Sequence, residues 1–210
     1  MKIGIIGVGN VGGALGKGWA KKGHQVVFGV RNTSDPKVSA AVKDVGNNAR
    51  AGSVAEAAGF GEVVVLATPW PGAQDAIRSA GDLSRKILFD CTNPLKADLS
   101  GLDVGFTTSA AEQVQSWAQG ARVVKIFNTT GSNNMENPRY SEGPATMFYC
   151  GDDAQAKSAA KALAADLGFD PVDAGPLRSA RLLEPLAMLW IHLAFAQNMG
   201  REFAFRLMRR

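Results

Sequence analysis

Three glycines near the start of the chain have the spacing of a phosphate-binding turn. Gly7, Gly9 and Gly12 lie in the string GVGNVG, which directly follows the apolar run KIGII and opens a helical pattern. In that context the first glycine permits a tight turn, the second lets the backbone approach a pyrophosphate, and the third lets helix and strand pack closely. Backbone amides at the helix start, from Asn10 and Val11, would meet the anion. The sequence thus predicts a dinucleotide-binding turn, with a ligand-free glycine turn as the alternative.

The residue after the next strand indicates which dinucleotide is bound. In such units an acidic residue usually ends the second strand and binds the adenosine ribose. Here the chain has Arg31, just past the apolar run QVVFGV, and a guanidinium can hold a 2′-phosphate through two charge-assisted hydrogen bonds. The same loop offers further donors in Asn32, Thr33, Ser34 and Lys37. This pattern favours NADP(H) over NAD(H), and the alternative is a solvated arginine in a polar loop.

Apolar runs predict the elements that position these residues. Short β-branched runs at residues 2–6, 25–30, 62–69, 86–90, 122–128 and 145–150 alternate with Ala-rich helical patterns. Several of the runs are continuously apolar, as strands covered on both faces are. The alternation predicts a Rossmann-type, doubly wound α/β fold with a mainly parallel sheet and a small C-terminal helical extension.

The chain changes character after about residue 150. A helix is expected from a cap at Asp152 or Asp153 to Gly168, followed by a short strand in FDPVDAG. From Pro176 onward the pattern predicts one long helix or two helices, apolar over more than one face.

We therefore expect a dinucleotide-binding domain over residues 1–150 and a helical extension over 151–210. The extension would pack against that domain and form a homodimer interface. Its helices are expected to bury four side chains against the sheet or across the dimer: Leu183, Leu186, Leu189 and Phe195.

Composition argues against several other classes of protein. The 210 residues are 46% apolar and 20% charged, as in ordinary globular proteins, and the net charge of +4 is matched by four arginines within residues 201–210. The sequence has no stripe of aromatic and basic residues of the kind that binds nucleic acid, so nucleic acid binding is not expected. Cys91 and Cys150 are too far apart for a metal site and fit a reducing cytoplasm. The apolar run at 185–196 is too short for a membrane span, so neither membrane nor metal is expected.

Several stretches together resemble one family. They are GVGNVG with GVRN, LATPW at 66–70, DCTNPL at 90–95, KIFNTTG at 125–131, GDD at 151–153 and DAGPLRSARLLEPLA at 173–187. The chain resembles the NADPH-dependent reductases of the 8-hydroxy-5-deazaflavin coenzyme F420, whose fold family also includes the cytosolic domain of six-transmembrane metalloreductases. The match covers nearly the whole chain.

This resemblance implies a cofactor path along the carboxyl ends of several strands. Three strand ends carry small polar groups, at the edge where open α/β sheets hold ligands. In the family these loops surround the middle and nicotinamide end of NADP(H). The residues assigned to cofactor binding in this way are Thr68, Pro69, Trp70, Asn93, Pro94, Asn128, Thr129 and Thr130. The acceptor pocket would be lined by Leu186, Met188, Leu189, Trp190 and His192, for which core packing is the alternative.

No acid–base pair is evident from the sequence. A carbonyl or imine reductase needs a proton donor beside its substrate, for which Lys125 and His192 are the candidates, and Arg181 could pair with Glu184 at near-helical spacing. Hydride transfer to a flavin or deazaflavin requires less of the protein, because the ring system delocalises charge. We therefore expect an NADPH-dependent enzyme with a deazaflavin or flavin as its small-molecule acceptor. The alternatives are a carbonyl or imine reductase and a non-catalytic NADPH sensor.

Overall fold

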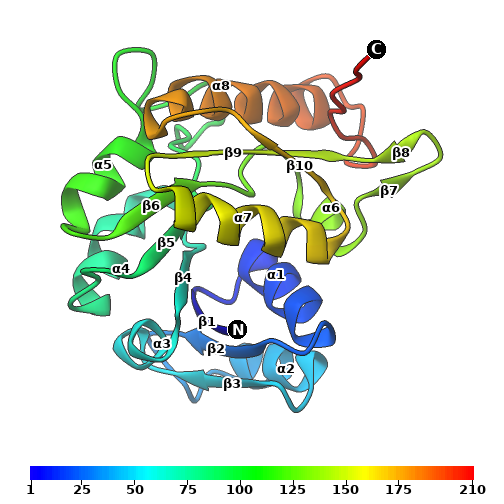
Figure 1. The fold of residues 1–210 in the computed structure, drawn as a ribbon. Coiled ribbons are helices and arrows are strands. Elements are labelled where there is room, and N and C mark those ends of the chain that lie inside the picture. Colours follow the sequence, from blue (N-terminus) through cyan, green and yellow to red (C-terminus); the bar gives the residue numbers. More distant parts are fainter.

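The computed structural model describes all 210 residues except the side chain of Lys37. Eight strands form one sheet in the order β10-β9-β6-β5-β4-β1-β2-β3, and a short hairpin, β7-β8, stands apart (Figure 1). The strands are β1 (Lys2–Ile6), β2 (Gln25–Gly29), β3 (Ala49–Gly52), β4 (Val63–Leu66), β5 (Ile87–Asp90), β6 (Arg122–Lys125), β7 (Arg139–Tyr140), β8 (Gly143–Pro144), β9 (Thr146–Gly151) and β10 (Asp170–Asp173). The helices are α1 (Asn10–Lys21), α2 (Pro36–Val45), α3 (Val54–Phe60), α4 (Ala73–Ala80), α5 (Ala110–Trp117), α6 (Ser132–Glu136), α7 (Ala154–Leu167) and α8 (Ala180–Ile191), with 3₁₀ turns at Trp70–Gly72 and Leu177–Ser179.

The sheet is mainly parallel and doubly wound, which confirms the predicted fold class. The chain moves outward from β1 to β2 and β3, then returns to the other side of β1 with β4, so the strand order reverses between β1 and β4. The one antiparallel pairing joins β6 to β9, and β10 then runs parallel to β9. The predicted division at residue 150 falls inside β9, and β10, which follows α7, continues the same sheet.

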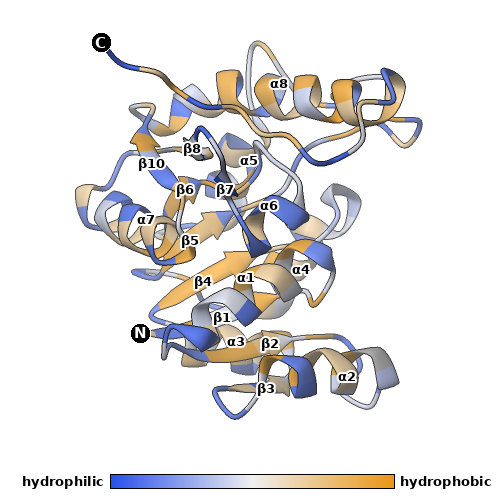
Figure 2. Ribbon diagram, turned by 90° about the vertical axis from the view of Figure 1, so that its right-hand side faces the viewer, coloured by the Kyte–Doolittle hydropathy of each residue, from blue (hydrophilic) through white to orange (hydrophobic). Residues whose placement is uncertain are grey.

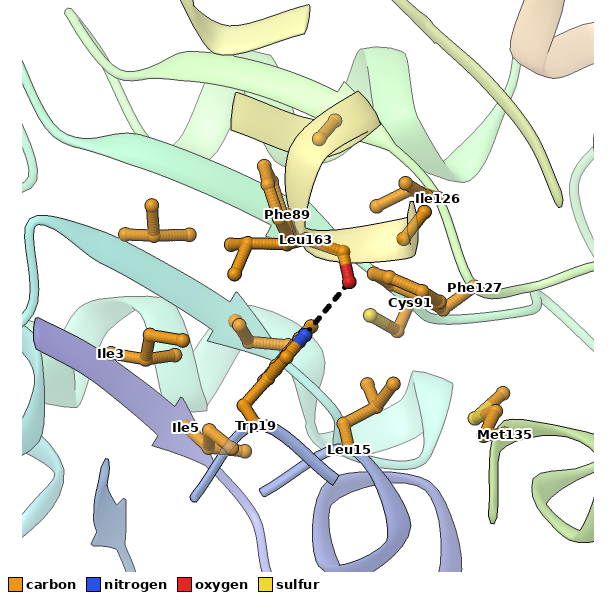
Figure 3. Packing of buried hydrophobic residues seen from close by; sticks show 14 of the residues in the cluster. Ile3, Ile5, Leu15, Trp19, Phe89, Cys91, Ile126, Phe127, Met135 and Leu163 are labelled. Carbon is orange, nitrogen blue, oxygen red and sulfur yellow. Dashed lines mark hydrogen bonds between the residues drawn. The ribbon is translucent and has the colours of Figure 1, made fainter. Parts of the chain in front are cut away.

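Helices cover both faces of the sheet with apolar side chains. One buried cluster includes residues of α1, α6 and α7, and the other includes residues of α3, α4, α5 and α8. In the first cluster the indole of Trp19 is fully buried and donates from Nε1 to the Leu163 carbonyl at 2.9 Å (Figure 3). A buried indole N–H needs an acceptor, so this bond fixes α1 against α7.

The C-terminal segment differs in part from its predicted form. The cap on Asp153, which accepts from the Ala156 amide, and the left-handed Gly168 bound α7 as expected. After Pro176, however, the chain forms the 3₁₀ turn at Leu177–Ser179, α8 and one π turn (His192–Ala196), and the last residues run without regular structure. The helix does not continue because Asn198 has a left-handed φ of 53° and the tail finds other partners.

Those partners are the start of β9 and the side chains of α6. Thr146 donates its amide to the Phe205 carbonyl at 3.0 Å, and Asn134 donates from Nδ2 to the Phe203 carbonyl at 2.8 Å. The tail therefore holds α6 and the start of β9 together through hydrogen bonds to both.

Of the four side chains expected to be buried against the sheet or across a dimer, the single chain fully buries one. Leu183 is 4% exposed and Leu186 is half-buried, whereas Leu189 and Phe195 are 47% and 53% exposed in the single chain. Figure 2 shows α8 coloured mostly as hydrophobic, although it forms an outer layer of the molecule. The helix thus buries only one side against the sheet.

Candidate cofactor site

A cleft of about 620 Å³ lies at the carboxyl ends of β1, β2 and β4, where the strand order reverses. This is the position at which doubly wound sheets bind ligands. Its wall includes six residues predicted from the sequence: Gly7, Gly9, Arg31, Asn32, Thr68 and Pro69. The loops after β1, β2 and β4, which we predicted from the sequence to bind one cofactor, therefore meet around one cavity.

The glycine loop has the geometry that its motif requires. Gly7 has a φ of 108°, and a Cβ there would stand 2.6 Å from the Ala67 carbonyl oxygen. A Cβ at Gly12 would stand 2.3 Å from the Gly7 carbonyl oxygen, so helix and loop can approach only with glycine. At Gly9, by contrast, a Cβ would meet no described atom within 4 Å, and the residue lines the cleft. The open space above Gly9 suits a bound group.

The start of α1 is suited to an anion. Gly9 is the N-cap, no described side chain caps the helix, and its first turn has no acidic residue. The free amides, which begin at Asn10 and Val11, therefore retain their capacity to donate to a ligand.

The Arg31 loop forms the opposite wall of the cleft. Arg31 is exposed, and none of the ion pairs among the described residues involves it. Asn32 shapes the loop, because its Oδ1 accepts the amide of Ser34 at 3.0 Å. Ser34 is exposed but is not part of the cleft wall, and the Lys37 side chain lies outside the described residues.

Thr68 and Trp70 point to different environments after β4. The Thr68 hydroxyl oxygen is buried and has no hydrogen-bond partner among the described residues, and the residue lines the cleft. The Trp70 ring instead stacks on Trp117 of α5, with centroids 5.3 Å apart and planes 26° apart. The structure therefore places Thr68 toward the cleft and uses Trp70 to pack α5.

The loops after β5 and β6 are bonded to one another. Asn93 donates from Nδ2 to the Asn128 carbonyl at 3.0 Å. Asn128 in turn donates from Nδ2 to Oδ1 of Asn93 at 3.2 Å and to the Leu183 carbonyl at 3.1 Å. Pro94 and Thr129 are buried, and the Thr130 hydroxyl accepts from Asn134 at 2.7 Å. These residues form a second group, separate from the wall of the 620 Å³ cleft.

A fully buried ionic cluster lies beneath this second group. Lys125 Nζ stands 2.9 Å from Asp90 Oδ2, 2.6 Å from the Thr92 carbonyl and 2.9 Å from Glu184 Oε1. Burial acts to lower the pKa of Lys125, but the attraction of Asp90 and Glu184 outweighs it and the pKa lies above its usual value. For Glu184 burial wins over the attraction of Lys125, so its pKa is raised. The ammonium stays charged at neutral pH.

Arg181 and Glu184 do not pair with each other, so that expectation was wrong. Arg181 forms a bidentate ion pair with Glu112, in which its Nε and Nη2 donate to the two carboxylate oxygens at 2.9 and 2.7 Å. The Glu184 carboxylate instead accepts hydrogen bonds from the backbone amides of Ala110 and Ala111 at 2.9 and 3.1 Å. Both side chains therefore join α8 to the first turn of α5. Their partners are more than 55 positions away in the sequence, which near-helical spacing could not reveal.

The candidate acceptor residues on α8 have mixed surroundings. Leu186 and Met188 are half-buried and Leu189 is exposed. His192, for which a core position was the other expectation, is exposed at the end of α8, with Nε2 3.2 Å from Nε2 of Gln197. Trp190 is buried: it stacks on Phe203 and lies so close to the loop after Thr130 that a Cβ on Gly131 would stand 2.5 Å from its ring.

Sequence reasoning missed one wall of the cleft. Asp75, Ala76 and Ser79 of α4 line it, together with Gly72 and the apolar Val54. Their spacing in α4 gave no chemical signal, and only the sheet order, which sets β4 beside β1, brings α4 to this cavity.

The fold and the cleft define a class: a Rossmann-type α/β protein with the features of a dinucleotide-binding site. Residues 2–94 match the model of the family described as NADP oxidoreductase, coenzyme F420-dependent. A solved structure from Arthrobacter sp. FB24, named as a candidate F420-dependent NADP reductase, is 32% identical with a TM-score of 0.89, and all of each chain is covered. The chain belongs to this family of NADP-dependent oxidoreductases.

Other similar proteins have varied names. The chain is 31% identical over 90% of its length to metalloreductase STEAP3 of Rattus norvegicus, but spans only 37% of that protein. A hypothetical protein from Sinorhizobium meliloti is 26% identical, with a TM-score of 0.77 over 86% of this chain and 88% of its own. A reductive aminase from Aspergillus terreus, solved with NADPH4, shares the fold at 18% identity, with a TM-score of 0.68 over 93% of this chain and 62% of its own. Among the described residues, no helix has both the length and the apolar character to cross a bilayer.

Proposed function

We propose that this protein binds NADPH along the carboxyl ends of its strands and transfers hydride between NADP(H) and a deazaflavin or flavin. The observation that carries the proposal is the convergence of the glycine loop, Arg31 and Thr68 on one cleft. Family membership supports the NADP(H) part of the proposal, whereas the acceptor rests on the resemblance of the site motifs.

The residues present fit the cofactor. Open space above Gly9 and uncapped amides at the start of α1 suit a pyrophosphate, and Arg31 suits a 2′-phosphate at the far wall. Thr68 Oγ1 and Asn128 Oδ1 are buried without partners among the described residues. Since such groups cost free energy unless they are bonded, a ligand with polar groups would satisfy them.

The chain's own contribution to hydride transfer would be to position the cofactor and the acceptor and to exclude water from between them. Bound NADPH would supply the hydride, and a flavin or deazaflavin ring would accept it without a positioned protein acid. The loops after β4, β5 and β6 would hold the nicotinamide end, with Thr68, Pro69, Asn93, Pro94, Asn128, Thr129 and Thr130 as the contacts, and Trp70 would support them from behind. The half-buried face of α8 near Trp190 would cover the acceptor, and residues 151–210 would thus complete its pocket.

A carbonyl or imine reductase fits the structure less well. The candidate proton donor Lys125 is 0% exposed, and its three N–H donors already have three acceptors, Asp90, Thr92 and Glu184. The other candidate, His192, is exposed, and Gln197 is the partner of its ring among the described residues. Neither side chain has the place of a general acid beside a buried ligand.

A panel of acceptors tests the proposal. NADPH oxidation is followed optically with coenzyme F420, FMN, FAD, ferric chelates, quinones and small carbonyl or imine compounds. Turnover with the deazaflavin or a free flavin is the expected outcome. Turnover only with carbonyls or imines would overturn the assignment, and tight NADPH binding without oxidation by any acceptor would indicate a sensor. A homodimer and a cytoplasmic location remain predictions.

A further inference from the structure

The buried ionic cluster has no part in the hydride transfer proposed above. It holds two acidic side chains and one ammonium, Asp90, Glu184 and Lys125, and each is 0% exposed. Replacing a buried ion pair by apolar residues of similar volume is often neutral or stabilising, so such a cluster is poorly explained as a source of stability. Its location suggests a different role.

The cluster joins the ends of two central strands to α8. Asp90 is the last residue of β5 and Lys125 the last residue of β6, while Glu184 comes from α8. Lys125 also holds the Thr92 carbonyl, and Thr92 donates its amide and hydroxyl to Asp90 Oδ1 at 2.9 and 2.7 Å. The backbone is therefore fixed up to the residue before Asn93.

The path from Lys125 to Asn128 is fixed as well. Between them Phe127 adopts a left-handed φ of 61°, which costs a non-glycine residue free energy unless the surroundings hold it. Its ring is held by Trp19, Phe89 and Phe169, whose ring centroids lie 5.6, 6.4 and 6.4 Å away. The backbone that leads to Asn128 is therefore held at Lys125, where β6 ends, and again at Phe127.

Hydrogen bonds determine which way the Asn128 side chain faces. Asn93 is oriented because its Nδ2 donates to a carbonyl, which leaves Oδ1 of Asn93 as an acceptor toward Asn128. Asn128 faces that oxygen and the Leu183 carbonyl, so only Nδ2 can point toward them. Its Oδ1 must then point the other way, where it is buried and has no partner among the described residues.

We propose that Glu184 is a positioning residue: by binding Lys125, and by anchoring α8 to the first turn of α5, it holds the Asn93–Asn128 pair so that Asn128 Oδ1 accepts a hydrogen bond from an N–H donor of the bound nicotinamide end. This inference rests on the proposed function, because it requires NADP(H) to bind with its nicotinamide end at the loops after β5 and β6. Leu183, whose carbonyl orients Asn128, is the residue next to Glu184, so α8 acts on the loop at two adjacent points.

Arg181 provides a matched control within the same helix. It lies one turn before Glu184 and also joins α8 to α5, through Glu112. The Arg181–Glu112 pair is partly exposed, at 24% and 27%, and neither side chain bonds to Lys125 or Asn128. A role in docking α8 alone should make the two residues similar, whereas positioning should set Glu184 apart.

The test compares Glu184→Gln with Arg181→Met in the full-length chain. The probes are 2′,5′-ADP, which carries the adenosine and 2′-phosphate groups, and NADPH, followed by the fluorescence of its reduced nicotinamide. We expect Glu184→Gln to keep 2′,5′-ADP affinity within about twofold, to weaken NADPH about fivefold, near the value of one hydrogen bond, and to change the fluorescence of bound NADPH. Arg181→Met should change neither affinity at temperatures where both variants are folded.

Two results would overturn the inference. Equal behaviour of Glu184→Gln and Arg181→Met toward both probes would leave α8 docking as the whole role of Glu184. If Glu184→Gln does not fold, Asn128→Ala removes the acceptor directly, and unchanged NADPH affinity in that variant would also overturn it. Failure of the wild-type chain to bind either probe is a different outcome, because it would overturn the proposed function itself.

Discussion

Two regions along the cofactor edge of the sheet are built in different ways. Around the glycine loop and Arg31 the polar groups face a cleft of about 620 Å³ and have few internal partners. In the loops after β5 and β6 the polar groups are buried and bonded to each other, to the Lys125 cluster and to α8. The first region can exchange water for ligand at little cost to the fold. In the second, binding and folding depend on the same bonds, so substitutions should affect both.

The largest effect is expected in the buried region. Lys125→Met leaves Asp90 and Glu184 without their cation, and breaking a buried ion pair in this way costs about 3–5 kcal/mol. Chemical denaturation should show that loss in the free energy of unfolding. A cost below about 1 kcal/mol would mean that the cluster is hydrated and that the two regions are more alike than the structure indicates.

The next largest effect should appear in the open region and in binding alone. Arg31→Ala should weaken NADPH about 10- to 100-fold, the range of one or two charge-assisted hydrogen bonds, and NADH hardly at all. The midpoint of thermal unfolding should not change, because Arg31 is exposed and takes part in no ion pair among the described residues. Equal losses for NADPH and NADH would remove Arg31 from the phosphate site.

A methyl group at Gly9 tests whether the space above the loop belongs to the ligand. Gly9→Ala should fold normally, since a Cβ there meets no described atom within 4 Å, yet NADPH and 2′,5′-ADP should both bind about tenfold more weakly. Gly59→Ala in α3 is the control, because its Cβ also meets no described atom and lies away from the cleft. Normal binding by Gly9→Ala would place the pyrophosphate elsewhere.

The smallest expected effect is a pH dependence that only the buried region should show. Because burial raises the pKa of Glu184 above its ordinary value of 4.5, the folded chain keeps that proton at pH values where the unfolded chain has lost it. Its contribution to stability is full below pH 4.5 and is lost as the pH rises through the higher, folded pKa. The free energy of unfolding of the wild type should therefore fall relative to that of Glu184→Gln as the pH is raised from about 4 to 7. A constant difference would contradict the raised pKa.

Sequence reasoning was most successful where the signal is local. The turn at Gly7 and the position of Arg31 depend on a strand, a turn and a helix that are contiguous in the chain, and both line the cleft. It was least successful for α8 and the tail. An apolar pattern favoured more helix there, but Trp190 and Asn134 bind the tail backbone through the Phe203 carbonyl, and these tertiary contacts outweigh helical propensity.

Asn128 Oδ1, which has no partner among the described residues, was also beyond sequence reasoning. Asn128 was assigned to the cofactor path from its place after a strand, but its orientation depends on Asn93 and Leu183, 35 and 55 positions away. Likewise, a lysine ending a strand can face solvent or the interior, and the acceptors that hold Lys125 in the interior, Asp90, Thr92 and Glu184, come from distant parts of the chain. Such partners become visible only when the topology is known.

Two contacts of α8, one at Leu183 and one at Trp190, fix the number of residues that the helix can have between them. Leu183 binds the loop after β6, and Trp190 lies against Gly131 about 10 Å further along the helix, at 1.5 Å per residue. Inserting or deleting one residue between them would rotate Trp190 by about 100° and move it off Gly131. We expect relatives that keep both contacts to show no length variation between these two positions, while the surface loop at residues 96–105 can change freely in length.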